Sequence, residues 1–236
     1  MNAKLNYRPR SELEKVGTKI YNLLVDNFPQ TFYVGGMVRD LLLKRPITDI
    51  DIATKATPDQ VIKILEQAGI KFEARNKQFG VIIAAEHNLS IEITTFRKDY
   101  YGKSRYPKIS FVNTAKQDSK RRDFTINALY LSAKSAKILD YHKGLADLKT
   151  NQLKFIGNPI VRIKQDPLRV IRAVRFSKTH NLKLNVQTEN AIKKYLNLIG
   201  TLTATRIKNE LNKIKNIKKR NSVLREIDNK NLLDIK

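Results

Sequence analysis

The chain has 236 residues, of which 46 are Lys or Arg and 22 are Asp or Glu, so its formal net charge is +24. This length and a hydrophobic fraction of 41% suffice for one large or two small globular domains with an apolar core. Because the sequence contains no cysteine, disulfides, thiolate metal sites and a cysteine nucleophile are excluded.

The charge surplus is the first indication of a partner. A strongly cationic surface attracts polyanions and promotes phosphate binding, so we expect a nucleic acid partner. No apolar run approaches the roughly 20 residues that cross a bilayer, and residues 1–10 lack the apolar segment of a secretory signal. We therefore expect no membrane association and a cytoplasmic location, with an organelle as the alternative.

Hydrophobic periodicity predicts alternating helices and strands in the first part of the chain. Ser11 and Glu14 form a capping box, and Thr57 with Pro58 opens a second helix. Helices are expected over 11–28, 38–44 and 57–68, and strands over 31–34, 48–53, 80–86 and 90–96. Residues 98–108 are basic and carry three Tyr, Gly and Pro, which favours a mobile loop.

The pattern changes near residue 157. Before this point we expect a helix over 123–132 and strands over 137–141 and 153–156, and after it only helices, over 167–178, 186–198 and 203–217. The predicted fold class is α+β, with a mixed sheet and helices in a domain over 1–157 and an all-helical domain over 158–236. Residues 206–220 carry seven basic residues and one acid, which suits a phosphate backbone or a solvated helix face.

The first motif with chemical content is Gly35-Gly36-Met37-Val38-Arg39-Asp40, followed by Asp49-Ile50-Asp51. A glycine pair between a strand and a helix lets backbone amides approach phosphate oxygens, and Arg39 offers a bidentate phosphate contact. Strand alternation places Asp49 and Asp51 on one face, where two carboxylates suit Mg²⁺. An isolated Asp-x-Asp is often only a polar strand face, but the adjacent Gly-Gly turn favours a metal site.

Two arginine-rich segments follow. Arg121-Arg122-Asp123 precedes Asn127, and it indicates either the start of an amphipathic helix or a nucleotide contact through Arg122 with Asn127 shaping the site. Gln165-Asp166-Pro167 opens a helix that carries Arg169, Arg172 and Arg175. Because these arginines recur every three residues, they lie near one another along one side of the helix, each rotated slightly from the last. Asp166 alone fits a helix cap, and three arginines on one helix are compatible with a solvated face.

Together these segments resemble the class II nucleotidyltransferases of the DNA polymerase β superfamily, which comprise CCA-adding tRNA nucleotidyltransferases and bacterial poly(A) polymerases. The resemblance runs from about residue 33 to residue 215. It implies a catalytic head over 1–157 and a helical neck over 158–236 that recognises the base and binds RNA. It also implies two Mg²⁺ ions, CTP and ATP as substrates, tRNA as partner and the following site residues. Asp49 and Asp51 are catalytic and bind metal, and the nucleotide-binding residues are Gly35, Gly36, Arg39, Arg122, Asp166, Arg169, Arg172 and Arg175.

The resemblance also gives a physical account of base selection without a template. Cytosine and adenine both present an exocyclic amine. The carboxylate of Asp166 would accept a hydrogen bond from this amine, while Arg169 would donate one to the adjacent ring nitrogen. The strand Glu92-Ile93-Thr94-Thr95-Phe96-Arg97 matches the family as well. Glu92, Asp123 and Asn127 are therefore possible supporting residues. Glu92 is either a third carboxylate of the site or the polar face of a strand.

Two departures from the family pattern stand out. Gln165 replaces the usual Glu of Glu-Asp-x-x-Arg, which changes how Arg169 is held. The chain also ends shortly after the neck, so we expect a minimal form, a truncated product or a chain that needs another surface to hold tRNA. The expected activity is addition of C, A or both to the 3′ end of tRNA with release of pyrophosphate. The alternatives are a poly(A) polymerase, a CC-only or A-only enzyme, a non-catalytic RNA-binding protein and, disfavoured by the charge, a nucleotidyltransferase acting on small molecules.

Overall fold

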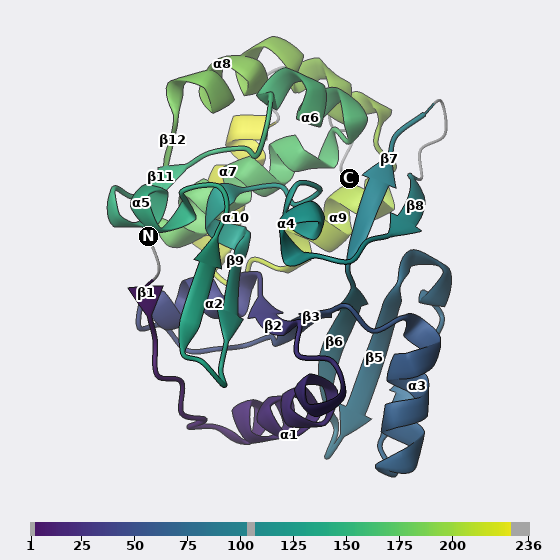
Figure 1. Cartoon of the computed structure of the whole chain (residues 1–236). Coiled ribbons are helices and arrows are strands. Elements are labelled where there is room, and N and C mark those ends of the chain that lie inside the picture. The colour runs from purple at the N-terminus through teal and green to yellow at the C-terminus, as the bar shows by residue number, and fades with distance from the viewer. Residues whose placement is uncertain (1–2, 103–106, 228–236) are drawn as a thin grey trace. The chain divides into compact units, whose positions relative to one another are not determined.

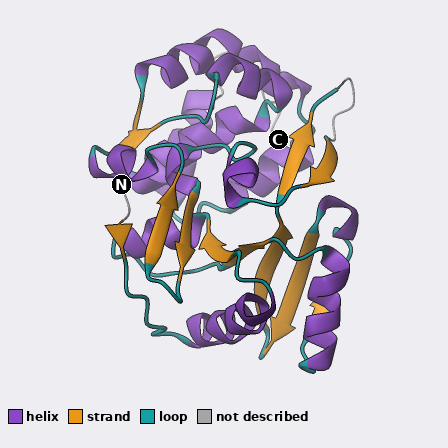
Figure 2. Ribbon diagram, viewed as in Figure 1, coloured by secondary structure: helices purple, strands orange, loops and turns teal. Residues whose placement is uncertain are grey.

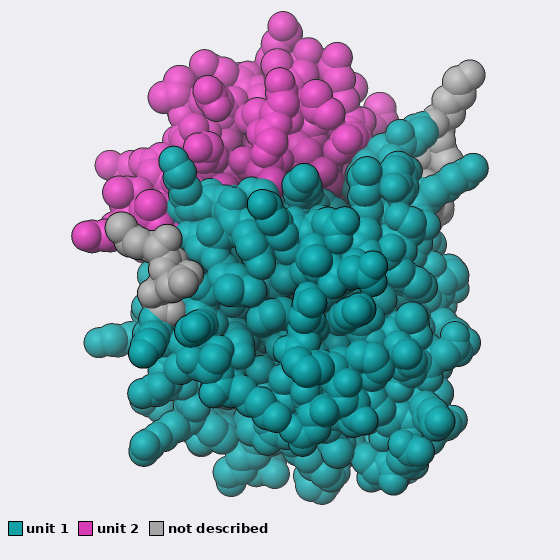
Figure 3. Space-filling model, viewed as in Figure 1, with its two compact units in different colours: residues 1–122, 126–144 teal, residues 123–125, 145–236 magenta. Residues whose placement is uncertain are grey.

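The structure, a computed structural model, describes residues 3–102 and 107–227 and divides into two compact units, coloured separately in Figure 3. Unit 1 comprises residues 1–122 and 126–144, and unit 2 comprises residues 123–125 and 145–236. Strands and helices both occur, as Figure 2 shows, and the predicted α+β class is confirmed. Within the described ranges, no helix combines the length and the apolar character that crossing a membrane requires.

The core of unit 1 is a mixed sheet (Figure 1). Its strands are β1 (Ala3–Lys4), β2 (Thr31–Val34), β3 (Asp51–Thr54), β4 (Lys71–Glu73), β5 (Val81–Glu86), β6 (Leu89–Thr95), β9 (Leu129–Ser132) and β10 (Lys137–Asp140). In the described residues their order is β1-β10-β9-β2-β3-β6-β5-β4. Only β3 and β6 are described as a parallel pair in this sheet, with Asp51 opposite Glu92.

Helices α1 (Glu12–Asn27) and α3 (Pro58–Gln67) pack against this sheet, as Figure 1 shows. Both predicted helix starts are confirmed: Ser11 Oγ accepts from the backbone N–H of Glu14, and Thr57 and Gln60 form a reciprocal capping box. The apolar face of α1 is buried at Val16, Ile20 and Leu24. Unit 1 also contains α2 (Gly36–Leu42) and α4 (Ala115–Ser119).

The strand predicted over 48–53 is shorter than expected, because β3 begins only at Asp51. The ladder between β2 and β3 ends at the Val34–Asp51 pair, since the next residue, Gly35, has a φ of 71° and turns the chain into α2. Asp49 therefore lies before the strand and is exposed, while Ile50 and Ile52 are buried and Asp51 is half-buried. This burial pattern follows the predicted alternation, and the shared face of Asp49 and Asp51 stays a prediction.

The helix predicted over 123–132 is also wrong. These residues form a short 3-10 turn, Thr125–Asn127, followed by strand β9. Because β9 lies between β2 and β10, Leu129, Tyr130 and Leu131 are all fully buried. Such a short, continuous apolar run has the same hydrophobic pattern in a buried strand as in a buried helix, so periodicity cannot distinguish the two.

The loop prediction over 98–108 is wrong at both ends, where residues 98–100 and residue 108 belong to strands. Strands β7 (Arg97–Tyr100) and β8 (Lys108–Phe111) form a separate antiparallel pair in unit 1. Arg97 pairs with Phe111, and Arg97 Nη1 donates to the carbonyl of Phe79. Residues 103–106 of the predicted mobile loop lie outside the described residues.

Unit 2 is mainly helical. Its helices are α5 (Gly144–Lys149, beginning in unit 1), α6 (Pro159–Gln165), α7 (Leu168–His180), α8 (Val186–Tyr195), α9 (Ala204–Asn212) and α10 (Ile217–Ile227). The strands β11 (Gln152–Leu153) and β12 (Lys183–Leu184) form a small parallel pair, so the expectation of helices alone after residue 157 misses β12. The single helix expected over 203–217 ends early, since α9 ends at Asn212 and α10 begins at Ile217.

Candidate active site

The turn after β2 brings backbone against a carboxylate. A Cβ built on Gly35 would lie 2.6 Å from Oδ2 of Asp51, and its φ of +71° is one that L-residues rarely adopt. Gly36 follows as the first residue of α2, and a Cβ there would lie 3.4 Å from Nη2 of Arg39. Of the predicted glycine pair, Gly35 thus places its backbone beside Asp51, and Gly36 places its backbone beside Arg39.

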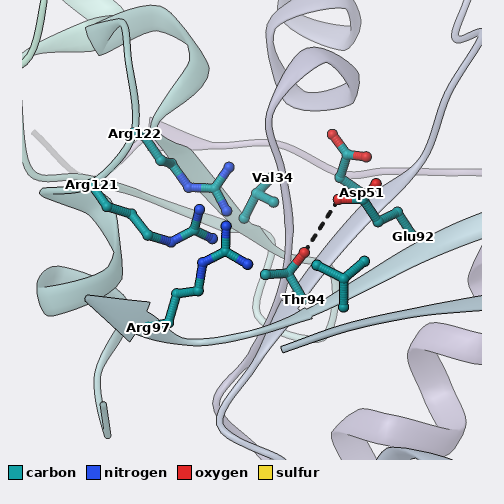
Figure 4. Close-up of a pocket in the computed structure, with 8 residues that line it drawn as sticks. Val34, Asp51, Glu92, Thr94, Arg97, Arg121 and Arg122 are labelled. Carbon is teal, nitrogen blue, oxygen red and sulfur yellow. Dashed lines mark hydrogen bonds between the residues drawn. The ribbon is translucent and has the colours of Figure 1, made fainter. Parts of the chain in front are cut away.

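Two carboxylates meet across the central parallel pair of strands. Asp51 on β3 lies opposite Glu92 on β6, and both line a solvent-open recess of about 90 Å³ in unit 1 (Figure 4). Thr94 Oγ1 donates to Oε1 of Glu92 over 3.4 Å, the contact dashed in Figure 4. Asp49 is exposed and accepts from Thr48 Oγ1 over 3.0 Å.

These acids supply the hard oxygen ligands that Mg²⁺ prefers. Within residues 3–102 and 107–227, three or more His, Asp or Glu side chains nowhere gather into a group able to hold a metal. The fit to a divalent cation thus rests on Asp51 with Glu92 beside it and on Asp49 two residues earlier in the chain.

Three arginines face these acids across the same recess. Figure 4 shows the guanidinium groups of Arg97, Arg121 and Arg122 gathered on one side and the carboxylates of Asp51 and Glu92 on the other. The arginine side chains are only 13–16% exposed. Burial lowers the pKa of Arg97, and the neighbouring Arg121 charge lowers it further. A recess with hard acids on one side and crowded guanidinium groups on the other suits a metal-bound phosphate.

Asp118 holds this arginine cluster in place. Its carboxylate is completely buried and accepts from Arg121 Nε over 2.7 Å, Arg122 Nε over 3.3 Å and the Tyr130 hydroxyl over 2.6 Å. Burial alone would raise the pKa of Asp118, but the charges of Arg121 and Arg122 and the Tyr130 hydrogen bond outweigh it and lower the pKa to about 2. Asp118 therefore remains ionised at neutral pH.

Arg39 lies buried beneath the glycine turn. Its Nε and Nη2 donate to the two carboxylate oxygens of Asp40 over 3.0 and 2.7 Å, and its Nη1 donates to Oδ1 of Asn127 over 2.7 Å. Arg39 is 4% exposed and Asn127 is 7% exposed. The structure thus brings together Gly36, Arg39 and Asn127, three of the residues singled out in the sequence, within unit 1.

In unit 2, Asp123 joins the arginine helix α7. Its Oδ2 accepts from Arg172 Nε over 2.8 Å and from Arg172 Nη2 over 2.5 Å. Burial would raise the pKa of Asp123, but Arg172 lowers it to about 2. Glu210 of α9 accepts from Arg175 Nε over 2.7 Å and lies 3.8 Å from Arg172. Arg172 and Arg175 are therefore held in an ion-pair network within this unit.

The residues expected to recognise the base lie at the junction of α6 and α7. Asp166 accepts from the backbone N–H of Leu168 over 3.2 Å and from Arg206 Nη2 over 3.0 Å. Arg169 is 5% exposed, and its Nη1 donates to the carbonyl of Arg162 over 2.7 Å and to Oε1 of Gln165 over 3.3 Å. Gln165 thus still positions Arg169, but as a neutral acceptor.

Sequence reasoning left four residues of the unit 1 site out of the predicted set, namely Arg97, Arg121, Asp118 and Thr94. The sequence does carry a signal for Asp118, because Arg121 and Arg122 follow it at i+3 and i+4, which is the spacing of ion pairs on a helix. Arg97 carried no such signal, since its place at the recess depends on the pairing of β7 with β8.

The chain is similar in sequence to proteins of known function. Residues 31–154 match the family model described as the poly A polymerase head domain. A CCA-adding enzyme of Ligilactobacillus salivarius is 40% identical over 180 residues, which cover 75% of this chain and 43% of that protein. The CCA-adding enzyme of Bacillus subtilis is 36% identical over 207 residues, which cover 86% and 51%. The chain thus spans about half the length of these curated relatives.

Among solved structures, the Bacillus stearothermophilus CCA-adding enzyme in complex with CTP aligns with a TM-score of 0.79 and 29% identity, over 92% of this chain and 53% of that chain. The fold and the site define a nucleotidyltransferase head followed by helices. The chain belongs to the poly A polymerase head domain family, the class II tRNA nucleotidyltransferases, and the predicted resemblance is confirmed. Nucleotidyltransferases of this family generally use a divalent metal.

Proposed function

We propose that the protein adds C, A or both to the 3′ end of tRNA without a template, using CTP and ATP. The observation that carries this proposal is the recess of unit 1, where Asp51 and Glu92 face Arg97, Arg121 and Arg122. Family membership and the CTP bound by the Bacillus stearothermophilus relative support the substrate class. We place this reaction in the cytoplasm.

In the proposed reaction, Asp49 and Asp51 would hold two Mg²⁺ ions, with Glu92 in support. When bound, these ions activate the attacking hydroxyl and stabilise the leaving phosphate oxygen. Asp51 would hold the reacting phosphate close to Gly35, because the carboxylate lies directly against the glycine backbone, where a Cβ would clash with it.

The triphosphate is proposed to lie along the backbone of Gly35 and Gly36. Arg39 would stabilise this turn, because its guanidinium lies close to Gly36 and donates a hydrogen bond to Asn127. Arg122 would contact the nucleotide from the other wall, since its Nε is held by Asp118 and the Tyr130 hydroxyl over 3.3 and 2.9 Å. A preorganised guanidinium stabilises developing phosphate charge without reorganisation.

Residues 158–236 are proposed to act as the neck that selects the base. Asp166 would accept from the exocyclic amine of cytosine or adenine, and Arg169 would donate to the adjacent ring acceptor. Uracil and guanine present a carbonyl at this place and would leave Asp166 without a donor. Arg172 and Arg175 complete the nucleotide-binding helix, with Asp123 holding Arg172.

Exposed lysines of the C-terminal helices suit RNA. Lys208 of α9 and Lys218 of α10 are exposed, as is Lys215 between the two helices. Each lysine that neutralises a phosphate releases a counterion, so this contribution to RNA affinity falls as salt rises.

The test is incubation of the purified protein with tRNAs that end before the first C, after C and after CC, with each nucleotide supplied separately. Sequencing of the 3′ ends then identifies the added residues. Completion of CCA on the first substrate supports the full reaction, whereas extension that stops at CC or occurs only after CC indicates a split activity. Long A tails on a primer other than tRNA, with ATP alone, would instead indicate a poly(A) polymerase, which the family model also covers.

A further inference from the structure

The recess of unit 1 extends toward one side of Asp51. Strand β3 has β2 on one side and β6 on the other, and Gly35 directly follows β2. Around Asp51, the sheet residues that line the recess are Val34 at the end of β2, Glu92 and Thr94 of β6, and Val81 of β5, so most of them lie on the β6 side. Asp51 therefore stands between the glycine turn and the part of the recess formed by β6 and β5.

An in-line displacement at phosphorus requires the attacking oxygen and the leaving oxygen on opposite sides of the reacting atom. With the triphosphate along Gly35 and Gly36, pyrophosphate leaves on the β2 side of Asp51. The attacking 3′-hydroxyl then reaches Asp51 from the β6 side, which is where Glu92 and Thr94 line the recess. The terminal nucleotides of the RNA must follow the same path.

Of the three arginines that face Asp51 and Glu92 across the recess, Arg97 and Arg121 share one partner. One oxygen of the buried Asp118, Oδ1, accepts both from Arg121 Nε over 2.7 Å and from the backbone N–H of Arg97 over 3.1 Å. Arg97 is further fixed by Asp99, whose Oδ1 accepts from its Nε over 3.1 Å. Figure 4 shows the guanidinium groups of Arg97 and Arg121 on the same side of the recess, and the charge of Arg121 acts on Arg97. Like charges placed this way repel each other, and an anion that contacts both relieves the repulsion. Their planar donor arrays match the oxygens of a phosphate.

We propose that Arg97 and Arg121 bind the last phosphodiester of the RNA substrate and thereby direct its 3′-hydroxyl toward Asp51. This inference rests on the nucleotidyl transfer proposed above. It assigns the two arginines to the RNA end, whereas Arg122 belongs to the incoming nucleotide. Glu92 lies on the same path and faces the terminal ribose.

The test is a cycle between protein and RNA variants. A tRNA ending in CC with a 3′-deoxy terminus is prepared with either a normal or an uncharged methylphosphonate linkage between its last two nucleotides. Its affinity is measured by fluorescence anisotropy for the unaltered protein, Arg97→Ala, Arg121→Ala and the double variant. Arg75→Ala is the matched control, since Arg75 belongs to unit 1 and its side chain is 86% exposed.

Loss of a charged hydrogen-bonded contact lowers affinity about tenfold, so the methylphosphonate should weaken binding to the unaltered protein by about that factor. In the double variant the same replacement should change affinity less than twofold, because the contact is already lost. Arg75→Ala should keep the full tenfold effect. Equal methylphosphonate effects in the unaltered protein and the double variant would overturn the proposal.

Charge-conserving variants keep the test valid if an alanine variant unfolds. Arg97→Lys and Arg121→Lys retain the charge beside Asp118 but lose the planar fork, and their melting temperatures report folding independently. In steady state they should raise the KM for RNA severalfold and leave the KM for CTP and ATP unchanged. A raised KM for the nucleotides with an unchanged KM for RNA would place the triphosphate here and overturn the proposal.

The binding cycle involves no turnover, so the two proposals fail separately. A coupled methylphosphonate effect in a protein that adds no nucleotide supports the RNA site and refutes the enzymatic function. Normal nucleotide addition without coupling refutes the RNA site and leaves the function standing.

Discussion

A Cβ on Gly35 would lie 2.6 Å from Oδ2 of Asp51, closer than a Cβ atom approaches another heavy atom in real proteins. The two residues are thus fitted to each other: the glycine sits at a φ of +71° where β2 ends, and the carboxylate begins β3. Any side chain at position 35 must displace the acid that is proposed to hold the metal.

Gly35→Ala is therefore expected to lower nucleotide addition at least about 100-fold, because a shift of about 1 Å in a catalytic group has effects of this size. Gly69→Ala is the matched control, since Gly69 has a similar φ of +67° and no atom within 4 Å of a built Cβ. Both variants should lose about 1 kcal/mol of stability from backbone strain. Single-turnover assays with labelled CTP separate the two, and comparable activity in both variants would contradict the close fit.

The paired acids give a second prediction. Asp49→Asn combined with Asp51→Asn should lower nucleotide addition by about three orders of magnitude or more, because amides hold divalent cations poorly in place of carboxylates. Binding of tRNA, measured by filter retention, should change less than threefold. Asp59→Asn, which removes a carboxylate that is 75% exposed on α3, is the control and should keep normal activity. Undiminished addition by the double variant would refute the metal assignment.

The elements that the sequence predicted best are those whose ends carry local signals. Ser11 and Thr57 cap α1 and α3 as expected, because their partners lie three residues away. Strand β9 escaped prediction, because Leu129 to Leu131 are buried by strands β2 and β10, which are distant in sequence.

The site shows the same division between local and distant determinants. The motifs singled out Asp51, Gly35 and Arg122 from sequence alone, and the structure places all three around one turn and recess. Arg97 reaches the recess only through the register of β7 and β8, and Asp118 matters through its complete burial. Register and burial are set by tertiary packing, which no short spacing in the sequence records.

Gln165 gives a third prediction, on base selection. Its Oε1 accepts from Arg162 Nη1 over 3.1 Å and from Arg169 Nη1 over 3.3 Å. Gln165→Ala removes this acceptor, so Arg169 should be less well oriented and discrimination against UTP and GTP should fall at least about tenfold. Gln165→Glu should retain the discrimination, because a charged acceptor holds a guanidinium more strongly.

Competition assays with mixed nucleotides on tRNA ending before CCA measure this discrimination directly. Gln187→Ala, at an exposed position of α8, is the control and should behave as the unaltered protein. Equal discrimination in Gln165→Ala and Gln187→Ala would contradict the positioning of Arg169 by Gln165.

Asp118 gives the last prediction, on stability in acid. Burial raises its pKa, but Arg121, Arg122 and the Tyr130 hydroxyl prevail, so the folded-state pKa is about 2 against an ordinary value of 3.8. Because the folded pKa is the lower one, the ionised group stabilises the fold above pH 4, and this contribution disappears as pH falls through 2. Linkage gives about 2 kcal/mol for a difference of this size.

Asp118→Asn should therefore lower the free energy of unfolding at pH 7 by at least about 2 kcal/mol, since it leaves buried guanidinium groups without their counterion. Its stability should also fall less steeply than that of the unaltered protein between pH 4 and pH 2. Urea unfolding followed by circular dichroism at pH 7, 4, 3 and 2.5 measures both effects. Asp59→Asn should show neither, because that carboxylate is largely exposed. If Asp118→Asn and the unaltered protein lost stability in parallel below pH 4, the charge of Asp118 would not be what holds Arg121 and Arg122 in the folded state.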